Sequence, residues 1–299
     1  MPEIKSVAIA GGSGTLGRHV LKAFLEADFE VTLLTRTAKA DGYDPKVKVQ
    51  VVDFTSIESL TAALKGIDAV VSTVAVEAQD SQHLLIDASV AAGVKRFIPS
   101  EFGSCTTSPE VASLPFYSPV VETRKHLQKQ CEIGNLTWTV LACGGFIEFL
   151  IGQPALVDLV NHKATLLDGG DNRASSTSLP NIAKAIAVIL KKFDATKNKV
   201  LKVSEVILTQ NRILAIAKKL KPEIEWDITN VESQALLKEA LAELAAGKFD
   251  MPVIMKLLKG TALGGDRYGG AYDKTDNELL GIKELTEEQL TALIAAKLA

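Results

Sequence analysis

The sequence predicts an α/β fold, a doubly wound parallel sheet with a smaller α+β lobe, and two observations carry this prediction. Short apolar runs alternate with segments of helical period, and a glycine-rich loop follows the first run. Such runs are typical of strands buried on both faces of a sheet, and their alternation with helices indicates right-handed βαβ units. The alternation stops near residue 150, so we expect one domain over 1–150 and a second lobe over 151–299, from which some segments return to the first domain.

Strands of the first domain are expected where β-branched and apolar residues cluster: at 7–10, 31–34, 49–52, 69–72, 96–99 and 137–141. Helices are expected between most of these strands. The segment 16–27 places apolar residues on one stripe, as a helix packed on a sheet does. The segments 56–65 and 82–92 stop at Gly66 and Gly93, which are residues typical of helix ends.

The second lobe shows isolated elements in place of the alternation. Thr286 is followed three residues later by Gln289, which is the spacing of a capping box. Helices are expected at 182–190, 211–220, 233–246 and 286–298, and a strand is expected at 199–203.

The composition excludes several classes of protein. The chain has 299 residues and a net charge of −3, so neither a nucleic-acid binder nor a polybasic membrane-surface protein is expected. No apolar stretch is long enough to span a membrane. The cysteines Cys105, Cys131 and Cys143 form no CxxC pair, and no His/Cys cluster indicates a metal. We expect a cytoplasmic protein without a metal, either a monomer or a homodimer.

The strongest local motif is the loop after the first strand, which reads Gly11-Gly12-Ser13-Gly14-Thr15-Leu16-Gly17. Gly11 permits a tight turn, Gly14 lets backbone N–H groups approach a pyrophosphate, and Gly17 lets the following helix pack closely. The N-terminus of that helix then faces the anion. A strand before the loop and a helix after it predict a Rossmann-like domain that binds a dinucleotide.

The end of the second strand distinguishes between the two nicotinamide dinucleotides. An acidic residue there would bind the ribose 2′-hydroxyl of NAD. This chain has Thr35-Arg36-Thr37 instead. Arg36 is suited to a 2′-phosphate, with a threonine hydroxyl as its partner, so NADP(H) is the expected cofactor.

Two further strand ends are expected to line the cofactor site. At Asp53-Phe54, the ring would flank the adenine, while the carboxylate would either accept from the adenine amino group or cap the next turn. Ser72-Thr73-Val74 ends the fourth strand, at the carboxyl edge where ligands bind in open sheets.

The first domain contains the segments GGSGTLG, LLTR, VVDF, DAVVSTVA and GVKRFIPSEFG. Together they resemble the isoflavone reductase-like, NmrA-like branch of the atypical short-chain dehydrogenases, which includes phenylcoumaran benzylic ether reductases. The resemblance implies an NADPH-binding domain with a substrate lobe. It implies that Gln82 opens the helix after the fourth strand and that Gly144-Gly145-Phe146 forms a turn on the nicotinamide side. The signature Ser100-Glu101-Phe102-Gly103 would lie beside the nicotinamide.

The resemblance also implies a lysine on the helix after this signature, as a proton shuttle or a ligand of the nicotinamide ribose. The matching position is Arg124, and Lys125 follows it. Arginine cannot be deprotonated in a protein, so it cannot replace a lysine as a proton shuttle. Either Lys125 takes the role after a small shift of alignment, or the lysine is absent. Tyr117 has Val121 four residues on, so the usual Tyr/Lys pair is absent.

These observations predict an NADPH-dependent reductase, of the isoflavone reductase-like type, that acts on a small aromatic or secondary-metabolite substrate. Two other functions stay open. One is a redox-sensing regulator that binds NADP(H) without turnover. The other is a cofactor-bearing enzyme that catalyses a non-redox isomerisation or cyclisation. Arginine in place of lysine at position 124 favours these two alternatives, because it removes a proton donor.

Overall fold

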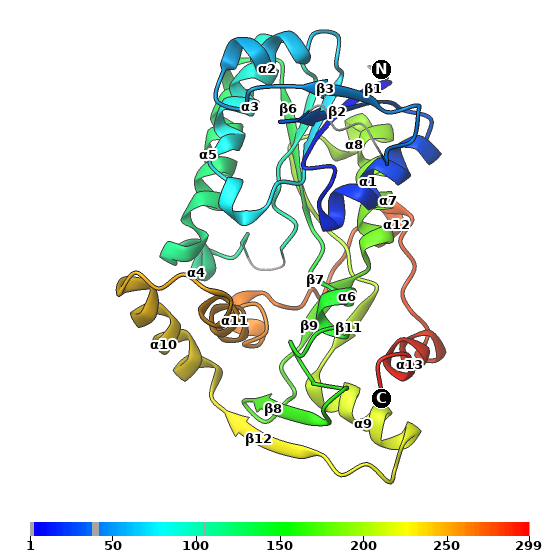
Figure 1. Ribbon diagram of the computed structural model, residues 1–299, viewed down its shortest axis with the longest axis vertical. Helices are drawn as coiled ribbons and strands as arrows, with labels where there is room; N and C mark the ends of the chain where they lie inside the picture. The colour runs from blue at the N-terminus through cyan, green and yellow to red at the C-terminus, as the bar shows by residue number, and fades with distance from the viewer. Residues whose placement is uncertain (1–2, 38–41, 104–105, 299) are drawn as a thin grey trace. The chain divides into compact units, whose positions relative to one another are not determined.

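The computed structural model describes residues 3–37, 42–103 and 106–298 (Figure 1). The chain divides into two compact units. The first comprises Met1–Phe102, Ala112–Leu141 and Leu179–Leu201, so it includes a segment from the second half of the sequence. The second comprises Gly103–Val111, Ala142–Ser178 and Lys202–Ala299.

A seven-stranded sheet organises the first unit, with strand order β10-β6-β5-β4-β1-β2-β3. Neighbouring strands from β3 to β6 pair in parallel, which confirms the predicted doubly wound sheet. The strand order reverses between β1 and β4, and ligands bind at such a switch point. The strands are β1 (Ser6–Ala10), β2 (Glu30–Thr35), β3 (Lys48–Val51), β4 (Ala69–Ser72), β5 (Arg96–Ile98), β6 (Thr137–Ala142) and β10 (Lys199–Lys202).

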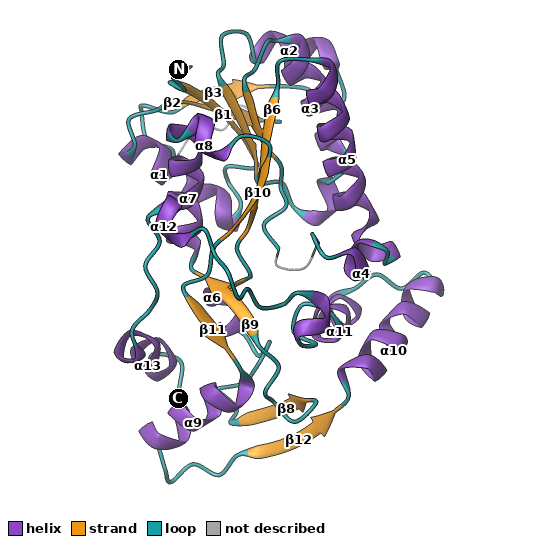
Figure 2. Cartoon of the chain, turned by 180° about the vertical axis from the view of Figure 1, so that it is seen from behind, coloured by secondary structure: helices purple, strands orange, loops and turns teal. Residues whose placement is uncertain are grey.

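Helices cover both faces of this sheet, with α1 and α7 on one face and α2, α3 and α5 on the other (Figure 2). The first of them buries Leu16, Val20 and Phe24, which recur every four residues and so share one stripe. The helical elements of this unit are α1 (Thr15–Glu26), α2 (Ile57–Ala63), the 3₁₀ turn Val76–Ala78, α3 (Ser81–Ala91), the 3₁₀ turn Pro115–Tyr117, α5 (Ser118–Ile133), α7 (Leu179–Lys191) and α8 (Phe193–Thr196).

The second unit has its own core, in which Leu167, Leu208, Ile213 and Ile294 are fully buried. Its strands form a three-stranded sheet, β11-β9-β7, and a two-stranded sheet, β12-β8. These strands are β7 (Gly145–Phe146), β8 (Lys163–Leu167), β9 (Ala174–Thr177), β11 (Val206–Leu208) and β12 (Asp227–Val231). The helical elements are α4 (Pro109–Ala112), α6 (Ile147–Leu150), α9 (Gln210–Leu220), α10 (Ser233–Ala245), α11 (Met251–Gly260), the 3₁₀ turn Asp266–Tyr268, α12 (Asn277–Leu280) and α13 (Glu287–Ala295).

The sequence predicted some elements of the second unit and missed others. The capping box at Thr286 is confirmed, since its hydroxyl accepts from Gln289 N–H and the Gln289 side chain accepts from Thr286 N–H. The sequence did not reveal β12, because most of that strand is exposed and it has no buried apolar run. Neither did it reveal α11, although Asp250 caps that helix through a hydrogen bond to Val253 N–H.

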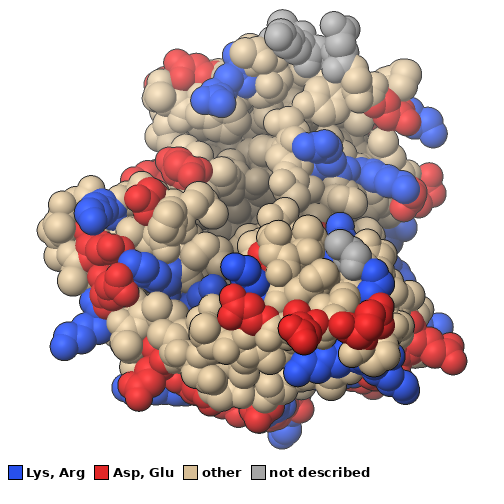
Figure 3. All heavy atoms as spheres, turned by 60° about the horizontal axis from the view of Figure 1, so that its bottom comes forward, with Lys and Arg blue, Asp and Glu red and all other residues tan. Residues whose placement is uncertain are grey.

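No helix within the described ranges has the length and apolar character needed to cross a bilayer. Lysine and arginine side chains are interspersed with aspartate and glutamate on the face shown in Figure 3. The charge on this face therefore agrees with the nearly balanced composition.

Asp68 ties the start of β1 to the start of β5. Its carboxylate accepts from the backbone N–H groups of Lys5 and Ser6, at 2.9 and 3.0 Å, and from Lys95 Nζ. Burial raises the pKa of Asp68, but these hydrogen bonds and the lysine charge outweigh burial, so its pKa lies below the usual value. A lowered folded-state pKa stabilises the fold above the unfolded-state pKa, and the stabilisation disappears as the pH falls through the folded-state value.

Asp68→Asn is therefore expected to lower the free energy of unfolding at pH 7 by about 1–3 kcal/mol, because it weakens charge-assisted hydrogen bonds. The difference from the wild type should shrink as the pH falls below about 4, where the wild-type carboxylate is protonated too. Urea denaturation at pH 7 and pH 3 measures this, with the exposed Glu30→Gln as control. An equal difference at both pH values would contradict the role of the charge.

Candidate functional site

The glycine loop forms a tight turn between β1 and α1. Gly11 has φ of +85°, which favours glycine, and its carbonyl oxygen accepts from Gly14 N–H at 3.0 Å. A Cβ on Gly17 would lie 2.2 Å from that same oxygen, so only glycine fits there. No acidic residue occupies the first turn of α1 and no side chain caps it. Its backbone N–H groups are thus available to an anion.

The loop lies directly against the end of β4. Thr73 donates to the carbonyl oxygen of Ala10 through its backbone N–H at 2.8 Å and through its hydroxyl at 3.0 Å. A Cβ on Gly11 would lie 2.6 Å from the Thr73 carbonyl oxygen. The neighbouring Ser72 hydroxyl is buried, and it has no hydrogen-bond partner in the described part of the chain. The structure thus brings together the glycine loop and Ser72-Thr73-Val74 at the switch point.

Arg36 lies at the carboxyl end of β2, on the other side of the switch point from β4. Its side chain is exposed and makes no ion pair with any residue that the structure describes. Beside it, Thr35 hydroxyl donates to the carbonyl oxygen of Thr37 at 3.2 Å and accepts from its N–H at 3.3 Å. These two hydrogen bonds form a tight turn at 35–37, and the guanidinium of Arg36 stays available for an anionic ligand.

Of the two roles considered for Asp53, the structure contains the capping one. The carboxylate accepts from Thr55 through its hydroxyl at 2.7 Å and through its N–H at 2.8 Å. Both hydrogen bonds lower the pKa of Asp53, and the one from the Thr55 hydroxyl has the larger effect. Phe54 is half-buried against the core below α2 and α3. Its exposed part is still free to contact a planar base.

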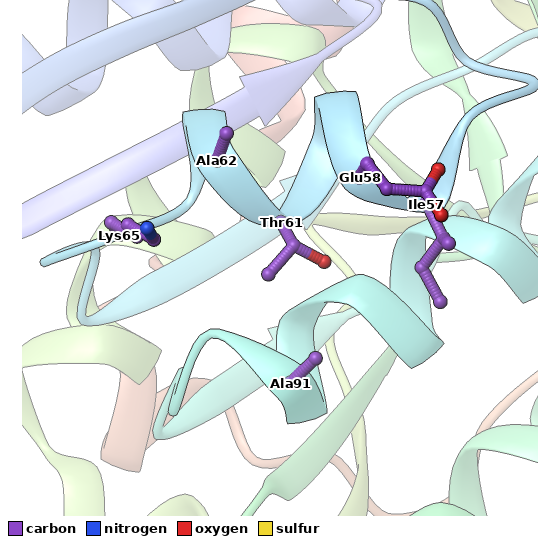
Figure 4. A pocket seen from close by; sticks show the side chains of 6 residues that line it. All are labelled: Ile57, Glu58, Thr61, Ala62, Lys65 and Ala91. Atoms are coloured by element: carbon purple, nitrogen blue, oxygen red, sulfur yellow. The ribbon is translucent and has the colours of Figure 1, made fainter.

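A hollow of 680 Å³ adjoins the glycine loop on the side of α1. Its lining includes Ser13 of the loop, Arg18 and Lys22 of α1, and Tyr43. A second hollow, of 330 Å³, lies between α2 and α3, where Figure 4 shows Thr61 and Ala91 facing each other. The second hollow contains none of the predicted site residues, so it is not the candidate site.

Two glutamines brace the loops that follow β4 and β5. Gln82 is buried, and its side-chain oxygen accepts from Ser100 N–H at 2.8 Å. Its amide group donates to the side chain of Gln79, which in turn donates to the Ser100 carbonyl oxygen at 3.0 Å. The Ser100 hydroxyl donates to the carbonyl oxygen of Val74 at 2.8 Å. The predicted residues Gln82, Ser100 and Val74 therefore meet in one network, and Gln79 is a member that the sequence did not single out.

Glu101 and Arg124 form an ion pair between the loop after β5 and helix α5. The Glu101 carboxylate accepts from Arg124 NH1, and the two side chains are 2% and 14% exposed. Lys125 lies on the exposed side of α5. Of the two alternatives left open by the sequence, the structure thus places arginine at the inward position. The adjacent Thr123 hydroxyl is buried and has no hydrogen-bond partner among the described residues.

The remaining predicted site residues lie further along the chain. Phe102 is buried at the end of the first unit, and the exposed Gly103 begins the second. In the second unit, Gly144 has φ of +69°, and a Cβ there would lie 2.0 Å from the Ser175 carbonyl oxygen. Gly145 and Phe146 form β7, which pairs with β9. The turn is therefore one that requires glycine.

Within the described ranges, we find neither a reactive cysteine thiolate nor a metal site. Burial raises the pKa of Cys131 to about 12, and it raises the pKa of Cys143 as well. Both thiols therefore stay protonated near neutral pH. Cys105 lies outside the described residues. Within those ranges, no group of three His, Cys, Asp or Glu side chains is arranged to hold a metal ion.

Comparison with known proteins agrees with this geometry. The model of the NmrA-like family matches residues 3–270. Oxidoreductase aprR of Aspergillus flavus is 31% identical over 298 residues, which cover 96% of this chain and 98% of that protein. An NADPH-dependent quinone oxidoreductase from Escherichia coli, solved with NADPH, matches with a TM-score of 0.74 at 21% identity, over 97% of this chain and 98% of that one. An isoflavone reductase structure gives a TM-score of 0.74 at 20% identity, over 96% and 98%. These two structures share the fold.

Proposed function

Since this chain belongs to the NmrA-like family, we propose that it is an NADPH-dependent reductase of a small aromatic or secondary-metabolite substrate. The observation that carries the proposal is the loop of Gly11, Gly14 and Gly17 at the switch point of a doubly wound sheet. The name of the relative aprR, an oxidoreductase that is similar along nearly its whole length, supports a redox activity.

The residues at the switch point fit NADP(H). A Cβ on Gly11 would meet the backbone of Thr73, and one on Gly17 would meet the backbone of Gly11, so these glycines let the loop pack tightly against β4 and α1. This tight turn supports a pyrophosphate site at the N-terminus of α1, where backbone N–H groups would bind it. The buried Ser72 hydroxyl, without a partner among the described residues, is suited to bind a polar group of the cofactor. Arg36 would bind the 2′-phosphate, with Thr35 and Thr37 beside it.

When bound, NADPH supplies a hydride from C4 of its nicotinamide. The chain's own contribution is to bind and orient. The first turn of α1 contains no acidic residue, so the N-terminus of this helix would hold the pyrophosphate. Gln82 holds Ser100 and the loop after β5 in place, and through that loop it positions Glu101. Glu101 in turn orients the guanidinium of Arg124.

We also propose a cytoplasmic location and a small-molecule partner. The protonated free thiol of Cys131 supports the location, because reducing compartments keep cysteines free of disulfides. The interspersed charges of Figure 3 support a small ligand over a nucleic acid. The oligomeric state, monomer or homodimer, is measured by light scattering.

Arg36→Glu tests the preference for NADPH. The carboxylate would repel a 2′-phosphate and accept from a 2′-hydroxyl, so the Kd for NADPH is expected to rise by about 100-fold while that for NADH changes little or falls. Fluorescence titration with both cofactors measures this, with the exposed Lys48→Glu as the matched charge control. An equal loss of affinity for both cofactors would contradict the assignment of Arg36.

The regulator that binds NADP(H) without turnover is the second candidate, and Arg124 is the observation that favours it. An arginine at the inward position provides no proton donor. Oxidation of NADPH in the presence of quinones, enones or aryl ethers distinguishes the two functions. Tight binding of NADPH with no oxidation by any acceptor would favour the regulator.

A further inference from the structure

We propose that Tyr272 is a positioning residue for hydride transfer, because its phenol oxygen holds the turn at Gly144 against which the nicotinamide of the cofactor would lie. The inference rests on the reductase function proposed above and adds to it a residue that no sequence motif marks. It follows from one hydrogen bond between residues 128 positions apart, from the anchoring of Tyr272, and from the place of the turn after β6.

The turn at Gly144 lies where the nicotinamide half of a dinucleotide is expected. Arg36 follows β2 on one side of the switch point, so the adenosine half belongs to that side. On the other side, β4 pairs in parallel with β5, and β5 with β6, so the carboxyl ends of these strands share one edge. Since β6 ends at Ala142, the chain leaves this edge through the turn at Gly144.

The backbone geometry of this turn makes it depend on its partner. Gly144 has φ of +69°, and its N–H lies in a buried hydrogen bond to the phenol oxygen of Tyr272, at 3.2 Å. A buried N–H without an acceptor is costly, so this bond favours one orientation of the peptide between Cys143 and Gly144. Removal of the phenol oxygen takes away the bond that fixes the peptide plane.

Tyr272 is itself held firmly within the second unit. It is 5% exposed, and its N–H donates to the hydroxyl of Ser175 in β9 at 2.9 Å. The N–H of Ser175 donates in turn to the carbonyl oxygen of Gly270 at 2.9 Å. Lys202 Nζ lies 5.3 Å from the centroid of the tyrosine ring, which is the range of a cation–π contact. The phenol therefore reaches Gly144 from a fixed base.

A fixed turn matters because hydride transfer depends steeply on geometry. The reacting atoms need to lie about 3–3.5 Å apart, and a misplacement of about 1 Å costs about 100-fold in rate. In this role the phenol acts on the nicotinamide through the turn. Tyr272 is therefore expected to affect the rate of hydride transfer much more than the affinity for the cofactor.

The binding test uses the fluorescence of NADPH, which comes from its nicotinamide and increases when a protein holds that ring rigidly. The wild type is expected to enhance it, and in Tyr272→Phe it should fall back toward that of free NADPH. The Kd from calorimetry should rise by no more than about 3-fold, because the lost hydrogen bond lies within the protein. Circular dichroism checks the fold, which the retained aromatic ring is expected to preserve.

Tyr268→Phe is the matched control for this test. Tyr268 belongs to the same unit, is also 5% exposed, and donates through its hydroxyl to Gln234 at 2.9 Å instead of accepting from the turn. This variant should keep the enhanced fluorescence. Fluorescence of bound NADPH equal to that of the free cofactor in wild type, or an enhancement that survives in Tyr272→Phe, would overturn the inference. So would an equal loss in both variants.

The kinetic test uses 1,4-naphthoquinone as the acceptor. Tyr272→Phe is expected to lower kcat by about 10-fold or more and to leave the KM for NADPH within about 3-fold of the wild type. The kinetic isotope effect with NADPH deuterated at the transferred position should be at least as large as in wild type, because hydride transfer is the slowed step. An unchanged kcat with a raised KM would overturn the inference.

The same measurements separate this inference from the proposed function. If the wild type and Tyr272→Phe bind NADPH and reduce the quinone equally well, the protein is a reductase but Tyr272 does not position the nicotinamide. Absence of NADPH binding by the wild type would refute the reductase itself, and the inference with it.

Discussion

Gly17→Ala is expected to weaken NADPH binding severely. The added Cβ would lie 2.2 Å from the carbonyl oxygen of Gly11 and 2.7 Å from the Cα of Gly12. Both are backbone atoms, so neither can turn aside as a side-chain end would, and the loop must move away from α1. Backbone N–H groups that bind a charged group each contribute about 1.5–3 kcal/mol, so losing two of them raises the Kd by about 100-fold or more.

Isothermal titration calorimetry with NADPH measures this loss. Gly134→Ala is the matched control, because its Cβ would meet Val90 Cγ1 at an ordinary 3.4 Å and its φ of −119° suits any residue. Circular dichroism spectra of both variants check that the fold is intact. Tight binding of NADPH by a folded Gly17→Ala protein would contradict the placement of the pyrophosphate at this loop.

The largest expected effect on stability comes from Arg96, a fully buried cation in β5. Its guanidinium donates to the hydroxyls of Thr137 and Thr139, both at 2.8 Å, and of Thr196 at 3.0 Å. It also donates to the carbonyl oxygen of Phe193 and lies 4.4 Å from the centroid of that ring. One side chain thus joins β5 to β6 and to α8, which comes from the second half of the sequence.

Arg96→Ala is expected to lower the free energy of unfolding by about 3–5 kcal/mol, because it leaves a cavity and removes buried donors from several oxygens at once. Burial lowers the pKa of Arg96 to about 10, against the opposing charge of Asp194. A lowered folded-state pKa means that burial makes the charged form of Arg96 less favourable in the folded protein than in the unfolded chain. The hydrogen bonds to the guanidinium offset this desolvation cost.

Urea denaturation measures the effect, and the exposed Arg18→Ala serves as a control that is expected to stay within about 0.5 kcal/mol of the wild type. A loss of less than about 1 kcal/mol in Arg96→Ala would mean that the hydroxyls find other donors. Arg96→Lys should also be destabilised, because an ammonium lacks the planar fork that reaches these partners at once.

The local pattern of apolar residues was sufficient to predict the sheet of the first unit. The strands β1, β2, β4 and β5 are short, mostly apolar runs that are buried along nearly their whole length, and such runs can be recognised in the sequence itself. The same holds for the glycine loop and for the capping box at Thr286, which depend on residues a few positions apart. By contrast, β12 is exposed and pairs with β8 far away in the chain, so no local signal marks it.

The candidate site divides in the same way. Residue types at strand ends predicted NADP(H), because the charge of Arg36 and the turn geometry of the glycines follow from their positions in the sequence. Of the two glutamines that bond to Ser100, the sequence predicted only Gln82, because Gln79 belongs to no recognised motif. The pairing of Glu101 with Arg124 was not visible, because it joins residues that are 23 positions apart.

The identity of the fold and of the cofactor therefore resides in short stretches of sequence, where turn geometry and apolar period act between near neighbours. The choice between Arg124 and Lys125 was made only in the folded protein. Adjacent helical positions differ by about 100° around the axis, and the docking of α5 onto the sheet decides which side chain turns inward to Glu101. That single rotation places a cation that cannot release its proton at the candidate reaction centre.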